Sequence, residues 1–210
     1  APSRGLGDVY KRQVSKGIYD ALIGEVPVED ALVHTKYGDV LPSNKALAGA
    51  GIELIGMERR EFLLRDALDK VKDRYDFLFI DCPPSLELLT LNALCAADAI
   101  LVPVQGEYYA LEGLSDLMNT VRIVRRSLNP RLELDGVLLT MFDGRTNLAL
   151  QVAEEVKHYF PGKVYATVIP RNVRLSEAPS HGKPITAYDR TSRGAEAYTA
   201  FAAEFLKKQS

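Results

Sequence analysis

The chain has 210 residues, of which 47% are hydrophobic and 26% are charged, and its 26 basic and 28 acidic residues give a net charge of −2. This composition excludes wholesale disorder, collagen-like repeats and coiled coils, and the length suits one domain with a substantial core. The longest apolar stretch, residues 99–104, is far shorter than the roughly 20 residues that span a bilayer, so we expect no membrane segment. Two isolated cysteines and three scattered histidines predict neither a metal centre nor a disulfide framework, which fits a cytoplasmic protein.

The first thirteen residues differ from the rest of the chain. They show no hydrophobic periodicity, and residues 8–13 read Asp-Val-Tyr-Lys-Arg-Gln, which one reading frame of a sequencing adapter also encodes. We therefore expect a non-native scar or a disordered head over residues 1–13 and a single domain over residues 14–210. The alternative is a native but frayed amino terminus.

From residue 14 onward, hydrophobic patterning predicts helices that alternate with buried strands. Helices are expected over residues 14–23, 64–75, 86–97, 111–124, 149–160 and 198–207. A short strand is expected at 39–42, and continuous apolar strands at 77–80, 99–104, 134–142 and 163–169. Strands that are apolar throughout are buried on both faces, so the pattern predicts an α/β fold with a doubly wound, mostly parallel sheet and helices on both faces.

Ligands bind such sheets outside the carboxyl ends of the strands. Asp81 lies at such a position, directly after the predicted strand 77–80, and is therefore a candidate ligand-binding residue. Four apolar residues deliver this carboxylate to the end of the predicted strand 77–80, as in a Walker B motif that holds Mg²⁺. Pro83 and Pro84 would fix the loop, and Ser85 could cap the next helix. The alternative is a strand-end aspartate that caps the following turn.

The partner motif, G-x-x-x-x-G-K-[ST], is absent from the printed sequence. Gly162-Lys163 is followed by valine, and Gly182-Lys183 by proline. A Walker B pattern without a Walker A loop indicates either that the protein is not a nucleotide enzyme or that it is a truncated one.

Five long stretches of the chain closely resemble the ParA/Soj chromosome-partitioning ATPases, the deviant-Walker P-loop group that includes the MinD-like proteins. They are residues 17–24, 75–86, 105–114, 138–146 and 168–184. The resemblance implies the P-loop NTPase fold without its first strand–P-loop–helix unit, because such a unit needs about 30 residues and residues 1–13 cannot hold it. The chain thus resembles an N-terminally truncated member.

The resemblance also implies the site residues. Asp81 would be the catalytic Walker B carboxylate, holding Mg²⁺ through a water molecule. ATP would place its adenine between the ends of two later strands, against Met141, Phe142, Asp143, Pro170, Arg171 and Asn172. Asn172 offers a donor and an acceptor to a base edge, although it could instead cap a helix, and the two roles could coexist. Residues 105–113 would lie near a dimer face, and the alternative for Tyr108 and Tyr109 is core packing.

The partners implied by the family are a second copy of the chain, non-specific DNA and a ParB/Spo0J-type protein that stimulates hydrolysis. Residues 162–210 carry a net charge of +4 against −6 for the rest, which favours an anionic partner for this part. The candidate DNA-binding residues are Arg174, Lys183, Arg190 and Arg193. The alternative is an ordinary solvated surface. A cytoplasmic, nucleoid-associated location in a bacterium would follow.

The sequence is compatible with either an enzyme or a noncatalytic protein. Without a Walker A loop we expect it to be inactive as an ATPase. Two other functions compete with the partitioning ATPase: a noncatalytic remnant that binds DNA or a partner protein, and a MinD-like membrane-cycling ATPase. The second would need a C-terminal amphipathic helix, whereas Phe201 and Phe205 are predicted to pack in the core.

Overall fold

The computed structural model describes residues 16–209, except 45, 84, 86 and 108–109. The chain divides into two compact units. The described residues of the amino-terminal unit are 16–98 and 120–132, and those of the carboxy-terminal unit are 99–119 and 133–209. Each unit has its own hydrophobic clusters.

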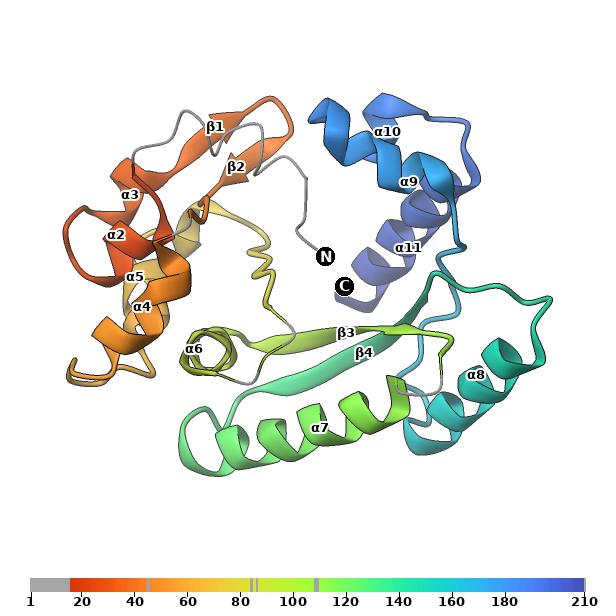
Figure 1. Cartoon of the computed structure of the whole chain (residues 1–210), viewed down its shortest axis with the longest axis horizontal. Coiled ribbons are helices and arrows are strands. Elements are labelled where there is room, and N and C mark those ends of the chain that lie inside the picture. The colour runs from red at the N-terminus through yellow and green to blue at the C-terminus, as the bar shows by residue number, and fades with distance from the viewer. Residues whose placement is uncertain (1–15, 45, 84, 86, 108–109, 210) are drawn as a thin grey trace. The chain divides into compact units, whose positions relative to one another are not determined.

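The amino-terminal unit consists of short helices and one hairpin (Figure 1). Its helices are α2 (Ile18–Leu22), α3 (Val28–Ala31), α4 (Leu47–Leu54), α5 (Leu63–Leu68), the 3-10 helix η1 (Lys72–Arg74) and α6 (Leu88–Ala96). The strands β1 (Val33–Thr35) and β2 (Gly38–Val40) pair antiparallel. The sequence predicted β2 as part of a strand at 39–42, but it gave no sign of β1 or α4. The single helix predicted at 64–75 is divided, because Lys70 and Val71 bond three residues back and tighten the chain into a 3-10 turn.

Buried polar side chains fasten this unit together. Asn92 on α6 is almost fully buried; its Oδ1 accepts from the Leu64 amide at 3.1 Å, and its Nδ2 donates to the carbonyls of Arg60 at 2.7 Å and Leu88 at 3.0 Å. The main apolar cluster comprises Leu22, Ala50, Leu54, Leu64 and Ala93. Asn92 thus ties α5 to α6 by hydrogen bonds within a largely apolar surrounding.

The strand predicted at residues 77–80 is not formed, and this prediction is wrong. The segment has no regular secondary structure, and Phe77, Leu78 and Phe79 are 43%, 42% and 74% exposed. Ile80, at the end of the segment, packs against the main cluster of the unit. A β-strand is stabilised by backbone hydrogen bonds to a neighbouring strand. None of the described strands pairs with this segment.

In the carboxy-terminal unit, β3 (Ala99–Gln105) and β4 (Glu133–Thr140) pair in parallel. Residues of α7 (Ala110–Ser127) and α8 (Asn147–Tyr159) pack on one face, where Val102, Val104, Val137 and Leu139 point. Residues of α11 (Arg193–Gln209) pack on the other face against Leu101 and Leu138 (Figure 1). The alternation of strand side chains between two apolar layers confirms the α/β fold with a parallel sheet and helices on both faces.

Residues 163–169 run parallel to β4 without forming a continuous strand. Backbone bonds join Val137 to Lys163 and Tyr165, and Leu139 to Ile169, at 2.8–2.9 Å. The approach is close, since a Cβ on Gly136 would lie 2.6 Å from the Tyr165 ring. In place of the fourth strand predicted here, the structure has isolated bridges at Val164, near its start, and at Pro170, one residue past its end.

Short helices follow this segment before the last long one. They are α9 (Val173–Glu177), the 3-10 helix η2 (Ala178–His181) and α10 (Ile185–Tyr188). Phe201 and Phe205 of α11 pack with Leu138, Tyr165 and Ile169, as the sequence predicted. Among the described residues, no helix combines the length and the apolar character that crossing a membrane requires.

Candidate nucleotide and magnesium site

The loop after β4 begins with an unusual backbone conformation at Met141. Its φ is +48°, in the left-handed region that bulky residues rarely adopt. This turn ends β4 at Thr140, two residues before the predicted end at residue 142. It also leaves the Met141 side chain 44% exposed at the carboxyl edge of the sheet, where ligands of parallel sheets bind.

Phe142 and Pro170 join the two predicted adenine loops. They form a parallel bridge, in which the Phe142 amide donates to the Ile169 carbonyl at 3.1 Å and the Arg171 amide donates to the Phe142 carbonyl at 3.4 Å. The Phe142 ring packs against the core cluster beneath. The structure therefore brings together five of the six predicted adenine residues on adjacent backbone segments, namely Met141, Phe142, Asp143, Pro170 and Arg171, and Asn172 follows directly.

The carboxylate of Asp143 is hydrogen-bonded by Arg145, a residue for which the sequence predicted no role. The carboxylate accepts from the Arg145 amide at 3.1 Å, from its Nε at 2.8 Å and from its Nη2 at 2.6 Å. These bonds lower the pKa of Asp143 to about 2, with a smaller contribution from the charge of Arg171. The two-residue spacing in Asp-Gly-Arg could have pointed to this turn.

Asn172 occupies the N-cap of α9. Its Oδ1 accepts from the Arg174 amide at 2.9 Å, which confirms the capping alternative. The capping bond uses the side-chain acceptor, and within the described residues Nδ2 has no hydrogen bond. The sequence predicted that Asn172 offers both a donor and an acceptor to the edge of the adenine base. Because the acceptor Oδ1 caps the helix, the donor Nδ2 is the group that remains available.

Asp81 lies in the amino-terminal unit, after the irregular segment 77–80, and it is exposed. Nowhere in the described part of the chain do three His, Cys, Asp or Glu side chains gather as a metal site. A single carboxylate nevertheless suits Mg²⁺, which commonly takes one or two carboxylates together with waters and substrate phosphates. Ser85 does not cap α6, whose N-cap is Glu87. Pro84, Tyr108 and Tyr109 lie outside the described residues.

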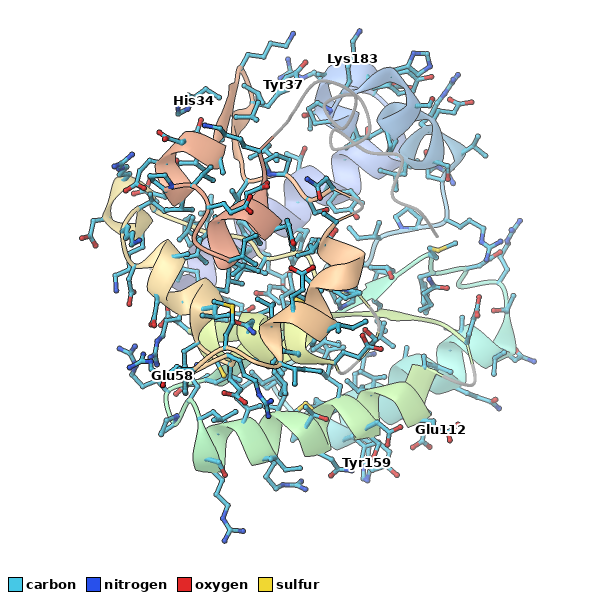
Figure 2. The ribbon with its side chains drawn as sticks, turned by 60° about the vertical axis from the view of Figure 1, so that its left-hand side comes forward. His34, Tyr37, Glu58, Glu112, Tyr159 and Lys183 are labelled. Atoms are coloured by element: carbon cyan, nitrogen blue, oxygen red, sulfur yellow. The ribbon has the colours of Figure 1, made fainter. Side chains whose placement is uncertain are left out.

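The four candidate DNA-binding residues differ in their surroundings. Lys183, Arg190 and Arg193 are exposed and make no ion pair with any described residue, and Lys183 points outward in Figure 2. Arg174 instead pairs with Glu177 at 2.8 Å and with Asp189 at 3.3 Å. Such exposed pairs contribute little stability, so a phosphate could replace the carboxylates around Arg174.

An apolar groove of about 640 Å³ lies between α8 and residues 162–168. Its lining includes Leu150, Ala153, Phe160 and Val168, and of the predicted site residues only Phe142. A triphosphate needs cationic or hydrogen-bond-donating partners, whereas most of this lining is apolar and its charged side chains are one lysine, Lys157, and one glutamate, Glu154, which would repel phosphate. The groove is therefore distinct from the site that the loops predict.

The sequence matches the AAA domain family over residues 3–134. It is 58% identical to the sporulation initiation inhibitor protein Soj of Bacillus subtilis over 202 residues, which cover 95% of this chain and 79% of that protein. It is 50% identical to the chromosome partitioning protein ParA of Myxococcus xanthus, over 98% of this chain and 73% of that one. Among solved structures, cobyrinic acid a,c-diamide synthase of Mycobacterium smegmatis, with bound ATP analog and magnesium, superposes with a TM-score of 0.79 at 35% identity, covering 94% of this chain and 74% of that one. Taken with the parallel sheet and its paired loops, these likenesses establish that the chain belongs to the ParA/Soj family of chromosome-partitioning ATPases.

Proposed function

We propose that the protein is a ParA-type ATPase that partitions a chromosome or a plasmid in the bacterial cytoplasm, in association with the nucleoid. In this function an ATP-bound homodimer binds DNA non-specifically, and a ParB/Spo0J-type partner stimulates hydrolysis. The observation that carries the proposal is the Phe142–Pro170 bridge, which aligns two polar loops at the carboxyl edge of a parallel sheet in a member of this family. The partitioning relatives are also more similar to the chain than the diamide synthase is, at 58% and 50% against 35% identity.

The adenine would be recognised by the donor that capping leaves on Asn172. Adenine presents ring nitrogens as acceptors, which the Asn172 Nδ2 can satisfy while Oδ1 remains bound to the Arg174 amide. Asp143 would act differently from a free acceptor, since Arg145 already bonds both of its carboxylate oxygens. Its role would be to hold the loop shape beside the base.

Asp81 would orient the magnesium ion through a water molecule. Mg²⁺ supplies charge neutralisation on the β- and γ-phosphates of ATP. The carboxylate is exposed, which suits a water-mediated contact. The backbone cradle for the phosphates must come from a Walker A loop, which the printed sequence does not contain, so we expect the 210-residue chain on its own to be inactive.

DNA would bind the basic residues of the carboxy-terminal unit through its phosphates. Lys183, Arg190 and Arg193 form no ion pair with a described residue, and Arg174 could exchange its exposed carboxylate partners for a phosphate. Contacts of this kind position a protein on DNA without reading its sequence. Non-specific binding is the consequence.

The test uses residues 14–210 joined at their amino end to a strand–P-loop–helix unit of the family, hereafter the P-loop form. We expect ATP turnover that rises on adding DNA together with a ParB-type partner, and that Asp81→Ala abolishes. The matched control is Asp76→Ala, which removes an exposed carboxylate at the other end of the same segment and should keep turnover near wild type. Equal activity of both variants would remove Asp81 from the mechanism, and absence of turnover in the P-loop form would refute the ATPase.

A further inference from the structure

The stretch that leads into the second adenine loop is held to β4 at both ends but not in its middle. The Tyr165 amide donates to the Val137 carbonyl at 2.9 Å, and the Ile169 amide donates to the Leu139 carbonyl at 2.9 Å. Between these points the amides of Ala166 and Thr167 turn away from the sheet. Ala166 is exposed and Thr167 is half-buried, so their partners within the fold decide whether this stretch is held to the protein or bonds to water.

Both amides donate to one side chain of the last helix, Glu204. Ala166 N lies 2.7 Å from Oε1, and Thr167 N lies 2.8 Å from Oε2. Partial burial opposes ionisation of Glu204, but the hydrogen bonds from Thr167 and Ala166 outweigh it, and the pKa of Glu204 lies below its ordinary value. The carboxylate thus takes the place that carbonyl groups would hold in a continuous ladder, and its charge strengthens both bonds.

Further contacts fix the end of α11 that carries this carboxylate. One turn on, the Lys208 Nζ donates to the Asp135 carbonyl at 3.2 Å and lies 4.0 Å from the centre of the Tyr165 ring. The Gln209 side chain donates to Asp135 Oδ1 at 2.8 Å, and the Tyr165 hydroxyl donates to Oδ2 at 2.5 Å. The carboxy-terminal end of α11 therefore contacts both the start of β4 and the stretch of residues 163–169 to which Glu204 is bonded.

We propose that Glu204 is a positioning residue for the adenine loop of residues 170–172, a role that rests on the proposed ATPase function. Its two hydrogen bonds set the path of the chain at Ala166 and Thr167. Only Val168 and Ile169 separate these residues from Pro170. The loop's own attachment ends in the Arg171–Phe142 bond of 3.4 Å, which is long for a backbone hydrogen bond. Ile169, whose amide and carbonyl are bonded to Leu139 and Phe142, anchors the start of the loop, and Glu204 sets the path of the chain just before this anchor.

The role predicts a selective effect on base recognition. Without the carboxylate, the exposed Ala166 and half-buried Thr167 amides lose their acceptors within the protein, and the chain is free to shift at Val168. Asn172, which would donate to the base, then moves relative to Phe142. The phosphate cradle belongs to another part of the protein, so binding energy from the triphosphate should be unaffected.

The experiment measures binding of mant-ATP and mant-GTP to the P-loop form and three variants. Glu204→Ala should weaken mant-ATP binding roughly tenfold, a loss of about 1.4 kcal/mol of binding free energy, and leave mant-GTP binding nearly unchanged. Glu204→Gln, which keeps one acceptor and the size of the side chain, should recover part of the preference for mant-ATP. Glu196→Ala removes an exposed carboxylate from the first turn of α11 and is the matched control, with wild-type binding of both probes.

A second measurement reports directly on the two hydrogen bonds to Glu204. Hydrogen exchange of the Ala166 and Thr167 amides should accelerate in Glu204→Ala and stay at the wild-type rate in Glu196→Ala. An unchanged ratio of mant-ATP to mant-GTP affinity in Glu204→Ala overturns the positioning role while leaving the ATPase intact. Failure of the wild-type P-loop form to bind mant-ATP overturns the ATPase, and the positioning role with it.

Discussion

Phe142 and Pro170 are parallel bridge partners at a level of the sheet where β4 has already ended. The left-handed turn at Met141 interrupts the strand, and the backbone of Phe142 resumes the pairing one residue later. Two loops that the chain separates widely are therefore set against each other by backbone bonds. Because the backbone fixes the two loops relative to each other, side chains of both loops can contact the same ligand.

The first prediction concerns the pH dependence of the Asp143–Arg145 pair. Because the pKa of Asp143 is lowered from 3.8 to about 2 in the folded protein, the pair stabilises the fold fully above about pH 4. This contribution is lost as the pH falls through about 2. Arg145→Ala should raise the pKa of Asp143 toward 3.8, as measured by NMR titration of its carboxyl carbon. Lys157→Ala, which breaks an exposed ion pair on α8, should leave that pKa unchanged.

A pKa of Asp143 that stays near 2 in Arg145→Ala would contradict this account. The remaining causes would then be the hydrogen bond from the backbone amide at position 145, which the substitution keeps, and the smaller contribution from the charge of Arg171.

The second prediction concerns catalysis by the chain as printed. We expect no ATP hydrolysis above background, because one exposed carboxylate at Asp81 cannot replace the backbone amides and lysine that neutralise the phosphates. A coupled phosphate-release assay on the purified 210-residue chain measures this. Turnover that Asp81→Ala abolishes would show that the chain carries a phosphate site of its own.

Much of the carboxy-terminal unit could be predicted because its signals are local. The apolar runs of β3 and β4 and the helical stripes of α7, α8 and α11 each reflect burial of that one segment. The cap role of Asn172 was one of the alternatives that the sequence offered, although the short helix it caps was not among the predicted helices. These elements need no knowledge of distant residues.

The errors arise where a distant partner decides the structure. Residues 77–80 have the composition of a buried strand, but a strand also needs a neighbour to pair with, and composition does not show whether one is present. The stretch 163–169 reads as one strand, yet Glu204 on another element takes two of its amides. Arg145 lay within a recognised motif whose spacing is compatible with a turn, but the binding of both Asp143 carboxylate oxygens by its side chain is seen only in the structure.

The third prediction follows from the exposed apolar side chains of residues 77–79. Such a patch favours association, so we expect the 210-residue chain to bind the dye ANS and to self-associate. Phe79→Ser, at the most exposed of the three, should lower both signals in fluorescence and light scattering. Ile52→Ser, at an 81% exposed position of α4, is the control and should have a smaller effect, because Ile52 lies outside this patch. A clean monomer with a sharp melt and no dye binding would count against the patch.

The fourth prediction concerns the buried amide of Asn92. Asn92→Ala removes an acceptor from the buried Leu64 amide and a donor from two carbonyls, so the free energy of unfolding should fall by about 3 kcal/mol. Urea denaturation of the P-loop form measures the change. Asn147→Ala, on an exposed side chain of α8, should stay within about 0.5 kcal/mol of wild type. Equal stability of the two variants would mean that water replaces the amide of Asn92 at no cost.

The last prediction concerns DNA binding by the P-loop form with ATP. Binding should be insensitive to sequence and should weaken steeply with salt, because it would rest on phosphate contacts. Arg193→Ala and Arg174→Ala should each lower the slope of log affinity against log salt by about 1, while ATP turnover without DNA is retained. Arg193 has no described ion pair to lose, so its variant reports the phosphate contact alone, whereas Arg174→Ala also frees Glu177 and Asp189. Lys70→Ala, an exposed cation of the amino-terminal unit, is the control and should keep the wild-type slope. Wild-type slopes in both arginine variants would reduce the positive charge of residues 162–210 to an ordinary solvated surface, and the DNA site would then have to lie on another basic surface of the protein.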